Sequence, residues 1–165
     1  MQDHILGPDT VEWLGTSYKT ILAAGEGSGS LSIVDSVTPA SMGPPRHVHE
    51  DADETFVILS GRVFFWLDGT VVERGPGESA HIPCGAEHTF RVSADGPSRH
   101  LVILSPGGFE EFFSDMATGG YQIPEDFDTI SDIGARYHLR FTGPPLTEEE
   151  TAVRTDCADG VARLR

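Results

Sequence analysis

The sequence predicts an all-β fold, a sandwich or barrel of short strands, followed by short helices toward the C-terminus. Nineteen glycines and eleven prolines are scattered along the 165 residues. Between them lie short runs rich in Val, Ile, Phe, Thr and Trp, a pattern typical of many strands joined by tight turns. After Leu104 the apolar residues recur at helical spacing instead. The length suits a single domain.

Nine runs are expected to be strands, because each combines β-branched or aromatic residues with flanking turn residues. In chain order they are Trp13–Leu22, Ser30–Thr38, Pro45–Glu50, Thr55–Ser60, Arg62–Leu67, Thr70–Arg74, Ser79–Ile82, His88–Ser93 and Arg99–Leu104. The pair Asp68 and Gly69 separates two of them, as in a two-residue hairpin turn.

The chain beyond the strands predicts helices. Phe109–Ala117 places its aromatic residues three and four apart, which indicates a helix with one apolar packing face. A weaker helix is expected over Glu125–Arg136, before the glycine and prolines of residues 143–145. Thr147 and Glu150 form a capping box for a short last helix. We therefore expect one domain over residues 1–146 and a short helical or flexible tail over 147–165.

The charge of the chain narrows its partners. There are 26 acidic and 11 basic residues, a formal net charge of -15. Such a surface repels phosphate backbones and anionic membranes, so no nucleic acid and no membrane is expected as a partner. No apolar run approaches the ~20 residues that span a bilayer. The N-terminus lacks the basic and apolar regions of a signal peptide, so a cytoplasmic location is expected.

Two cysteines, Cys84 and Cys157, lie far apart in the sequence. They form neither a disulfide framework nor a CxxC metal motif, so both are expected to be free thiols. A bridge between them stays open.

Three histidines and one glutamate have the spacing of a metal site. His47 and His49 lie two apart on an expected strand, so they face the same side. Glu54 begins the next strand, and His88 comes from a distant one. Three imidazoles and a carboxylate suit a divalent transition metal such as Mn, Fe, Co, Ni, Cu or Zn. Such a set leaves coordination positions open for water, dioxygen or substrate.

The residues around these four carry a resemblance to the cupin superfamily, whose two motifs are both present over residues 43–61 and 77–92. The first family motif is glycine, histidine-any-histidine, three or four residues, glutamate, six residues, glycine. It is matched here by His47, His49, Glu54 and Gly61, with the leading Gly43 two residues nearer to the histidines than usual. The second motif is matched by Gly77, Pro83, Gly85 and His88, with Val92 replacing a terminal asparagine.

The resemblance implies a cupin double-stranded β-helix, or jelly-roll barrel, with the metal inside the barrel mouth. It also implies a homodimer formed through exchanged edge strands, for which Trp13–Leu22 is the expected element. The segment 106–113 resembles the helix that follows the barrel in small bacterial cupins of the quercetin 2,3-dioxygenase-like type.

A substrate pocket can be sketched from the two-residue period of strands. If Glu54 points inward, so do Phe56 and Ile58, and if His88 points inward, so do Phe90 and Val92. Phe64 and Trp66 are expected as neighbours. An apolar, aromatic pocket above a metal favours a flat ligand with a few chelating oxygens. No Arg or Lys is expected inside, which disfavours a strongly anionic substrate and the metal-free sugar epimerases of the family.

The remaining candidate residues lack motif support. His81 is expected to be a packed strand residue, and Cys84 to be structural or incidental. His4, His100 and His138 are expected on the surface.

Three functions stay open at this point. The first is a metal-dependent dioxygenase, similar to quercetinases, in which Glu54 is the general base that accepts a substrate hydroxyl proton. The second is a cyclase, isomerase or lyase in which the metal acts only as a Lewis acid. The third is a non-enzymatic module that binds a small molecule.

Overall fold

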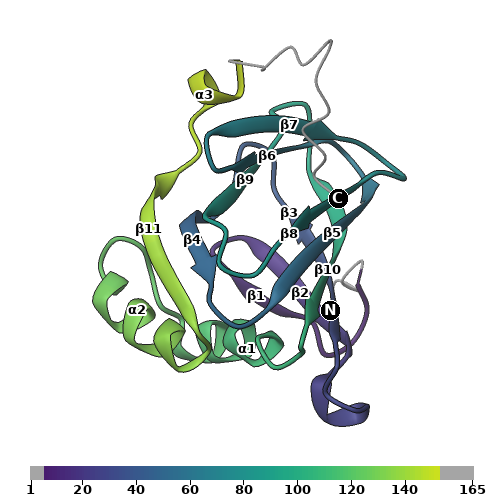
Figure 1. Cartoon of the computed structure of the whole chain (residues 1–165), viewed down its shortest axis with the longest axis vertical. Helices are drawn as coiled ribbons and strands as arrows, with labels where there is room; N and C mark the ends of the chain where they lie inside the picture. The colour runs from purple at the N-terminus through teal and green to yellow at the C-terminus, as the bar shows by residue number, and fades with distance from the viewer. Residues whose placement is uncertain (1–5, 153–165) are drawn as a thin grey trace.

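The computed structural model describes residues 6–152 and consists of two antiparallel sheets that face each other (Figure 1). The six-stranded sheet has the order β1-β2-β3-β10-β5-β8, and the five-stranded sheet has the order β11-β4-β9-β6-β7. The strands are β1 Val11–Trp13, β2 Thr16–Leu22, β3 Ser32–Thr38, β4 Pro45–His49, β5 Asp53–Ser60, β6 Val63–Leu67, β7 Thr70–Arg74, β8 Ser79–Ile82, β9 His88–Val92, β10 Ser98–Ser105 and β11 Leu139–Pro145. The predicted jelly-roll arrangement of short strands is confirmed.

The core lies between the sheets, and alternating strand residues supply it. In β10, the residues Ser98, His100, Val102 and Leu104 are buried, whereas the residues between them are only partly buried. The same alternation runs through the neighbouring β5 up to Ile58, and through the neighbouring β3 except at Asp35, which is also buried. This period of two is what a sheet with one buried face requires.

Within residues 6–152 the strands are accompanied by three α-helices and one 3-10 helix: η1 Ala24–Glu26, α1 Glu110–Gly119, α2 Phe127–Arg136 and α3 Glu148–Ala152. Figure 1 shows α1 and α2 at one end of the barrel and α3 near the other. The apolar face predicted for α1 packs inward: Phe112 is buried and meets the ring of Trp13 edge-on at 5.9 Å. The predicted capping box is present. The backbone N–H of Thr147 donates to the carboxylate of Glu150 at 2.9 Å, and the backbone N–H of Glu150 donates to the hydroxyl of Thr147 at 3.3 Å.

The run Trp13–Leu22, expected as one strand, is two. Leu14 and Gly15 both have positive φ, 48° and 79°, and this tight turn separates β1 from β2. The two strands pair with each other, and β2 pairs with β3 of the same chain. The strand propensity of the run was visible in the sequence, but the turn at a leucine was not.

Leu139–Pro145 forms β11, a strand that the sequence did not predict. Gly143, Pro144 and Pro145 suggested a break in the chain. However, β11 lies at the edge of its sheet, where proline is tolerated because one side of the strand has no partner. This strand pairs with β4, so it lies directly beside the predicted metal ligands.

Gly43 lies where two backbones approach closely. The segment before β4 pairs with β9 through Ser41 and Met42, whose backbone groups bond to Val92 at 3.1 and 2.9 Å. A Cβ on Gly43 would overlap the carbonyl oxygen of Phe90 and lie 2.9 Å from its carbonyl carbon. The contact is with backbone, so it cannot be relieved by a change of rotamer. Glycine at this position is therefore a packing requirement of the fold.

We predict that Gly43→Ala lowers the free energy of unfolding by about 1–3 kcal/mol, because the added methyl group overpacks a rigid contact. Gly96→Ala is the matched control, since nothing lies within 4 Å of a Cβ there, and it should change stability by less than about 0.5 kcal/mol. Urea unfolding followed by circular dichroism measures both. Equal stability of the two variants would show that Gly43 is not constrained.

Candidate metal centre

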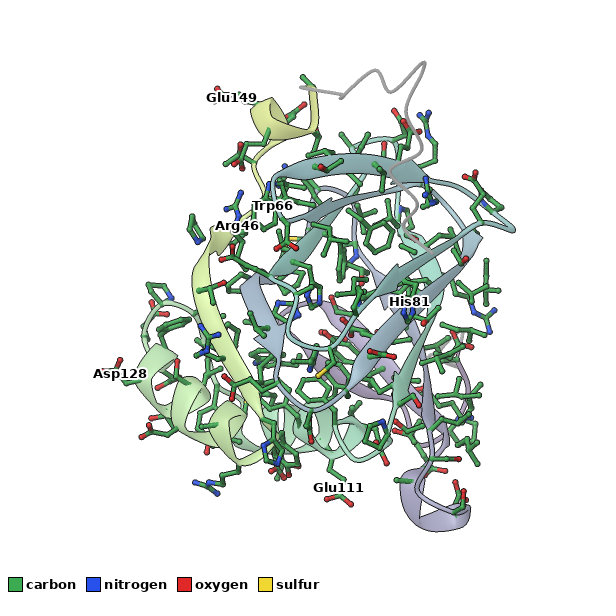
Figure 2. All side chains as sticks on the ribbon, viewed as in Figure 1. Arg46, Trp66, His81, Glu111, Asp128 and Glu149 are labelled. Carbon is green, nitrogen blue, oxygen red and sulfur yellow. The ribbon has the colours of Figure 1, made fainter. Side chains whose placement is uncertain are left out.

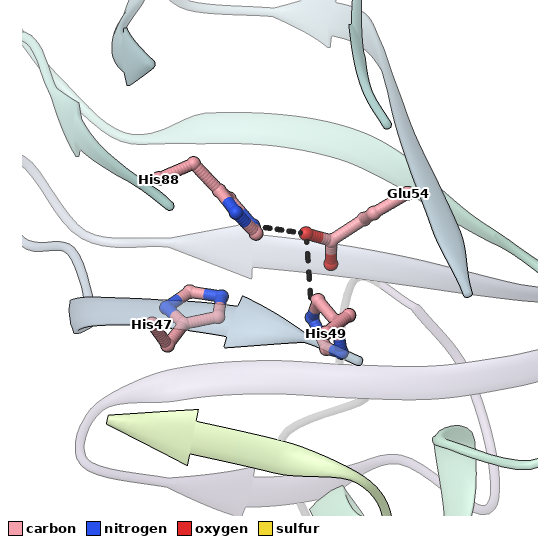
Figure 3. Close-up of side chains that lie close together, drawn as sticks. All are labelled: His47, His49, Glu54 and His88. Atoms are coloured by element: carbon pink, nitrogen blue, oxygen red, sulfur yellow. Dashed lines mark hydrogen bonds and ion pairs between the residues drawn. The ribbon is translucent and has the colours of Figure 1, made fainter. Parts of the chain in front are cut away.

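The four predicted ligands come from three strands and meet between the sheets. His47 and His49 lie on β4, His88 on β9 and Glu54 on β5. In the five-stranded sheet, His47 is the direct cross-strand partner of His88. Glu54 reaches the three rings from the facing sheet (Figure 3). One side-chain ligand atom from each residue lies within 4.8 Å of all the others, and all four residues are buried.

Backbone carbonyls orient two of the imidazoles. Nδ1 of His47 donates to the carbonyl oxygen of Pro45 at 2.8 Å, and Nδ1 of His88 donates to that of Ala86 at 3.0 Å. A carbonyl only accepts, so the proton sits on Nδ1 and Nε2 is directed into the cluster. This is the arrangement by which outer groups usually fix a metal-binding histidine.

His49 is held differently. Its Nδ1 is buried and has no hydrogen-bond partner among the described residues. The ring of Phe109 packs against it edge-on, with 4.5 Å between centroids. Packing rather than a hydrogen bond therefore sets the orientation of this ring.

The electrostatics of the cluster favour a cation. Burial, together with the neighbouring His88 and His49, lowers the pKa of His47 to about 3, so its lone pair is available at neutral pH. Burial works against ionisation of Glu54, but the imidazoles of His49 and His88 outweigh it and hold the pKa of Glu54 well below its usual range.

The contact between Glu54 and His88 shows where a cation would lie. Oε2 of Glu54 is 2.8 Å from Nε2 of His88 and 3.5 Å from Nε2 of His49. Burial lowers the pKa of His88, but the hydrogen bond to Glu54 outweighs it and raises that pKa. A proton on Nε2 satisfies this contact, and a divalent cation among the same atoms would replace the proton. Three nitrogens and one carboxylate oxygen, buried and converging, suit a divalent transition metal.

A cavity of about 300 Å³ opens beside the cluster. His47, His49 and Glu54 form part of its wall, and no Lys or Arg is among its lining residues. The rest of the wall is mainly apolar, and its aromatic residues are Trp13, Tyr18, Phe56, Phe90, Phe109, Phe112, Phe113 and Phe141. The pocket is therefore apolar, with its charged groups gathered at the metal cluster.

Two of the six expected pocket residues, Phe56 and Phe90, line this cavity. Ile58 and Val92 are buried in the core but do not form its wall. Phe64 and Trp66 lie outside it, because β6 turns the buried Phe65 inward and its neighbours outward.

Figure 2 shows Trp66 close to Arg46, and the guanidinium of Arg46 lies 4.6 Å from the indole centroid. Trp66 therefore belongs to an outer cation–π contact.

Sequence reasoning missed wall residues from outside the motifs. Phe109 and Phe113 of the α1 region and Phe141 of β11 all line the cavity. The helical spacing predicted that Phe109 and Phe113 lie on an apolar helix face, but it did not predict that this face lines the cavity. Phe141 was missed with its strand.

His100 was expected on the surface and is instead buried and part of the cavity wall. The signal was present in the sequence, because His100 shares the period of two with the apolar Val102 and Leu104.

The other candidates lie apart from the cluster. Nδ1 of His81 is 2.9 Å from the hydroxyl of Thr55, and His138 is largely exposed. Cys84 is an exposed free thiol. His4 and Cys157 lie outside the described residues.

A model of the cupin domain matches residues 34–104. That segment is a cupin domain. Quercetin 2,3-dioxygenase of Bacillus subtilis (strain 168) is 30% identical over 96 residues, which are 58% of this chain and 28% of that protein. The match thus spans little more than a quarter of that relative.

Two solved structures share the fold across most of the chain. A cupin-like protein from Thermotoga maritima aligns with a TM-score of 0.58 at 16% identity, over 92% of both chains. The polyketide cyclase RemF from Streptomyces resistomycificus aligns with a TM-score of 0.53 at 19% identity, over 84% of this chain and 77% of its own. Within residues 6–152, no helix is both long and apolar enough to cross a bilayer.

We predict that His49→Ala reduces bound metal from about one ion per chain to a small fraction, because one of four buried ligands is lost. The barrel should stay folded, since His49 is not a main core residue. His138→Asn is the control: it alters an exposed histidine with positive φ, a conformation that asparagine accepts. Elemental analysis of both purified variants is the measurement, and full metal content in His49→Ala would refute this ligand.

Proposed function

We propose that this chain is a metal-dependent dioxygenase that acts on a flat, hydroxylated aromatic compound of the flavonol type. The observation that carries the proposal is a buried three-histidine, one-carboxylate cluster that opens into an aromatic cavity. The similarity to quercetin 2,3-dioxygenase points in the same direction.

The cavity suits such a substrate in size and chemistry. At about 300 Å³ it lies at the lower end of small-molecule pockets, which favours a compact ligand. Aromatic rings from both sheets and from the α1 region offer faces and edges against which a planar molecule packs. Because the wall lacks Lys and Arg, a neutral ligand is favoured over an anionic one.

A divalent transition metal held by His47, His49, Glu54 and His88 would supply Lewis-acid chemistry and, for a redox-active ion, reactivity toward dioxygen. The protein residues contribute proton transfer. The carboxylate of Glu54 is buried at the cavity wall, so it lies where it can accept the proton of a substrate hydroxyl that enters the cavity. Phe109 covers His49 and keeps water from this side of the cluster.

A second candidate function is a metal-assisted cyclase or isomerase. The same buried cluster serves it without redox change. The polyketide cyclase with the same fold gives this candidate its specific support.

The homodimer and the cytoplasmic location stay predictions from the sequence.

We predict that the wild-type protein, loaded with iron, manganese, nickel, cobalt or copper, consumes dioxygen when a flavonol is added. Glu54→Gln should lower that rate by about 10²–10⁴-fold, the usual contribution of a general base, while part of the metal stays bound. An oxygen electrode, with parallel metal analysis, measures both.

Glu50→Gln is the matched control, because Glu50 is an exposed carboxylate on the neighbouring turn that pairs with Arg140 at 2.9 Å. Its rate should equal that of the wild type. An unchanged rate in Glu54→Gln would remove Glu54 from the base role. Conversion of an aromatic substrate without dioxygen, by the zinc-loaded protein, would favour the cyclase or isomerase.

A further inference from the structure

The cavity has a second polar region on the six-stranded sheet, which we call the polar row: Ser36 and Thr38 of β3 and His100 of β10. All three side chains line the cavity. The strands are paired so that His100 is opposite Ser36, and Thr38 is the next inward residue of β3. On the same face Leu104 is opposite Glu54, four residues along β10 from His100. Four residues of strand span about 13 Å, so along β10 the row is displaced from the metal cluster, although the charge of Glu54 still acts on His100.

The two hydroxyls of the polar row lack partners. The side-chain oxygens of Ser36 and Thr38 are buried, and neither has a hydrogen-bond partner among the described residues. The exposed fractions of these residues are 0% and 2%. A buried hydroxyl without a partner is unfavourable, and native proteins rarely leave one unless a ligand or water supplies the bond. Two such groups on one cavity wall therefore indicate a place for a polar group.

His100 adds a hydrogen-bond acceptor. The hydroxyl of Ser98 donates to the carbonyl oxygen of Ser60 at 3.0 Å, so it accepts from Nδ1–H of His100 at 3.3 Å. Nε2, on the other side of the ring, then carries the lone pair of the neutral imidazole. Burial lowers the pKa of His100 to about 4, so the ring is neutral at pH 7. Its neighbours Phe56 and Phe90, with centroids 5.7 and 5.5 Å away, leave that lone pair in apolar surroundings.

We propose that the polar row binds a hydroxyl group at the end of the ligand that lies farthest from the metal, with the hydroxyl donating to Nε2 of His100 and accepting from Ser36 or Thr38. The group is a neutral phenol. An ionised one is disfavoured because the cavity wall holds the carboxylate of Glu54 and no cationic Lys or Arg. This inference rests on the proposed class of ligand but not on the proposed reaction.

The test is a comparison of two probes, 3-hydroxyflavone and 3,4′-dihydroxyflavone, which differ by one hydroxyl at the far end of the molecule. Isothermal titration calorimetry under nitrogen, with the metal-loaded protein, gives the Kd of each. The wild type should bind the dihydroxy probe about tenfold more tightly, as expected for one satisfied hydrogen bond in an apolar site.

The variant His100→Leu should bring that ratio close to one, and His100→Gln, which restores an acceptor, should recover part of it. Val102→Ala is the control, because Val102 is an apolar wall residue on the same strand. It should weaken both probes alike and keep the ratio. Metal content of each variant verifies that the barrel is intact. A wild-type ratio of one, or a tenfold ratio that persists in His100→Leu, would overturn the proposal and assign the row to water.

A second readout separates this proposal from the proposed function. Phenol should shift the ¹⁵N resonance of Nε2 in His100, whereas toluene, of the same shape, should not. If flavones neither bind nor react but phenol gives this shift, the proposed function fails and the hydroxyl site stands. If phenol leaves the resonance unchanged in a protein that flavones do not bind, the hydroxyl site is overturned as well.

Discussion

The buried carboxylate of Glu54 is the constraint on which the rest of the structure depends. A charge in an apolar interior is tolerated only when groups of opposite character surround it. Glu54 stands on one sheet, and its partners His49 and His88 stand on the other. The two sheets must therefore keep a fixed separation and register at this point, and the space beside the cluster remains as a cavity.

The metal cluster and the cavity wall come from different parts of the chain. All four candidate ligands lie within residues 47–88, inside the segment that matches the cupin domain. Much of the wall lies outside that segment, on β1, β2, the α1 region and β11. His49 joins the two parts, because its ring packs against Phe109 while its strand pairs with β11. The metal ligands are thus separate in the chain from many of the residues that would contact a ligand in the cavity, which lie both before and after the matched segment.

The sequence predicted what short-range spacing determines. The motif distances identified the four clustered residues, and the period of two identified Phe56 and Phe90 as wall residues. Prediction from the sequence failed where the pairing of distant strands decides the structure. The segment of β11 was not predicted as a strand, and only an edge position makes its prolines compatible with one. Phe64 and Trp66 were expected in the pocket, although no residue of this strand indicated which of its two faces points into the barrel. His100 was judged by residue type, although its apolar neighbours in the period of two marked an inward position.

The pairing of β4 has a consequence for synthesis of the protein on the ribosome. The strand that bears His47 and His49 has one cross-strand partner pair with β9, and it otherwise pairs with β11. All four ligands have been translated by residue 88, but the strand that holds two of them in register ends at Pro145. The nascent chain thus carries the complete donor set well before it can fix its geometry. The geometry of the ligand cluster therefore depends on a strand that is synthesised after all four of its residues.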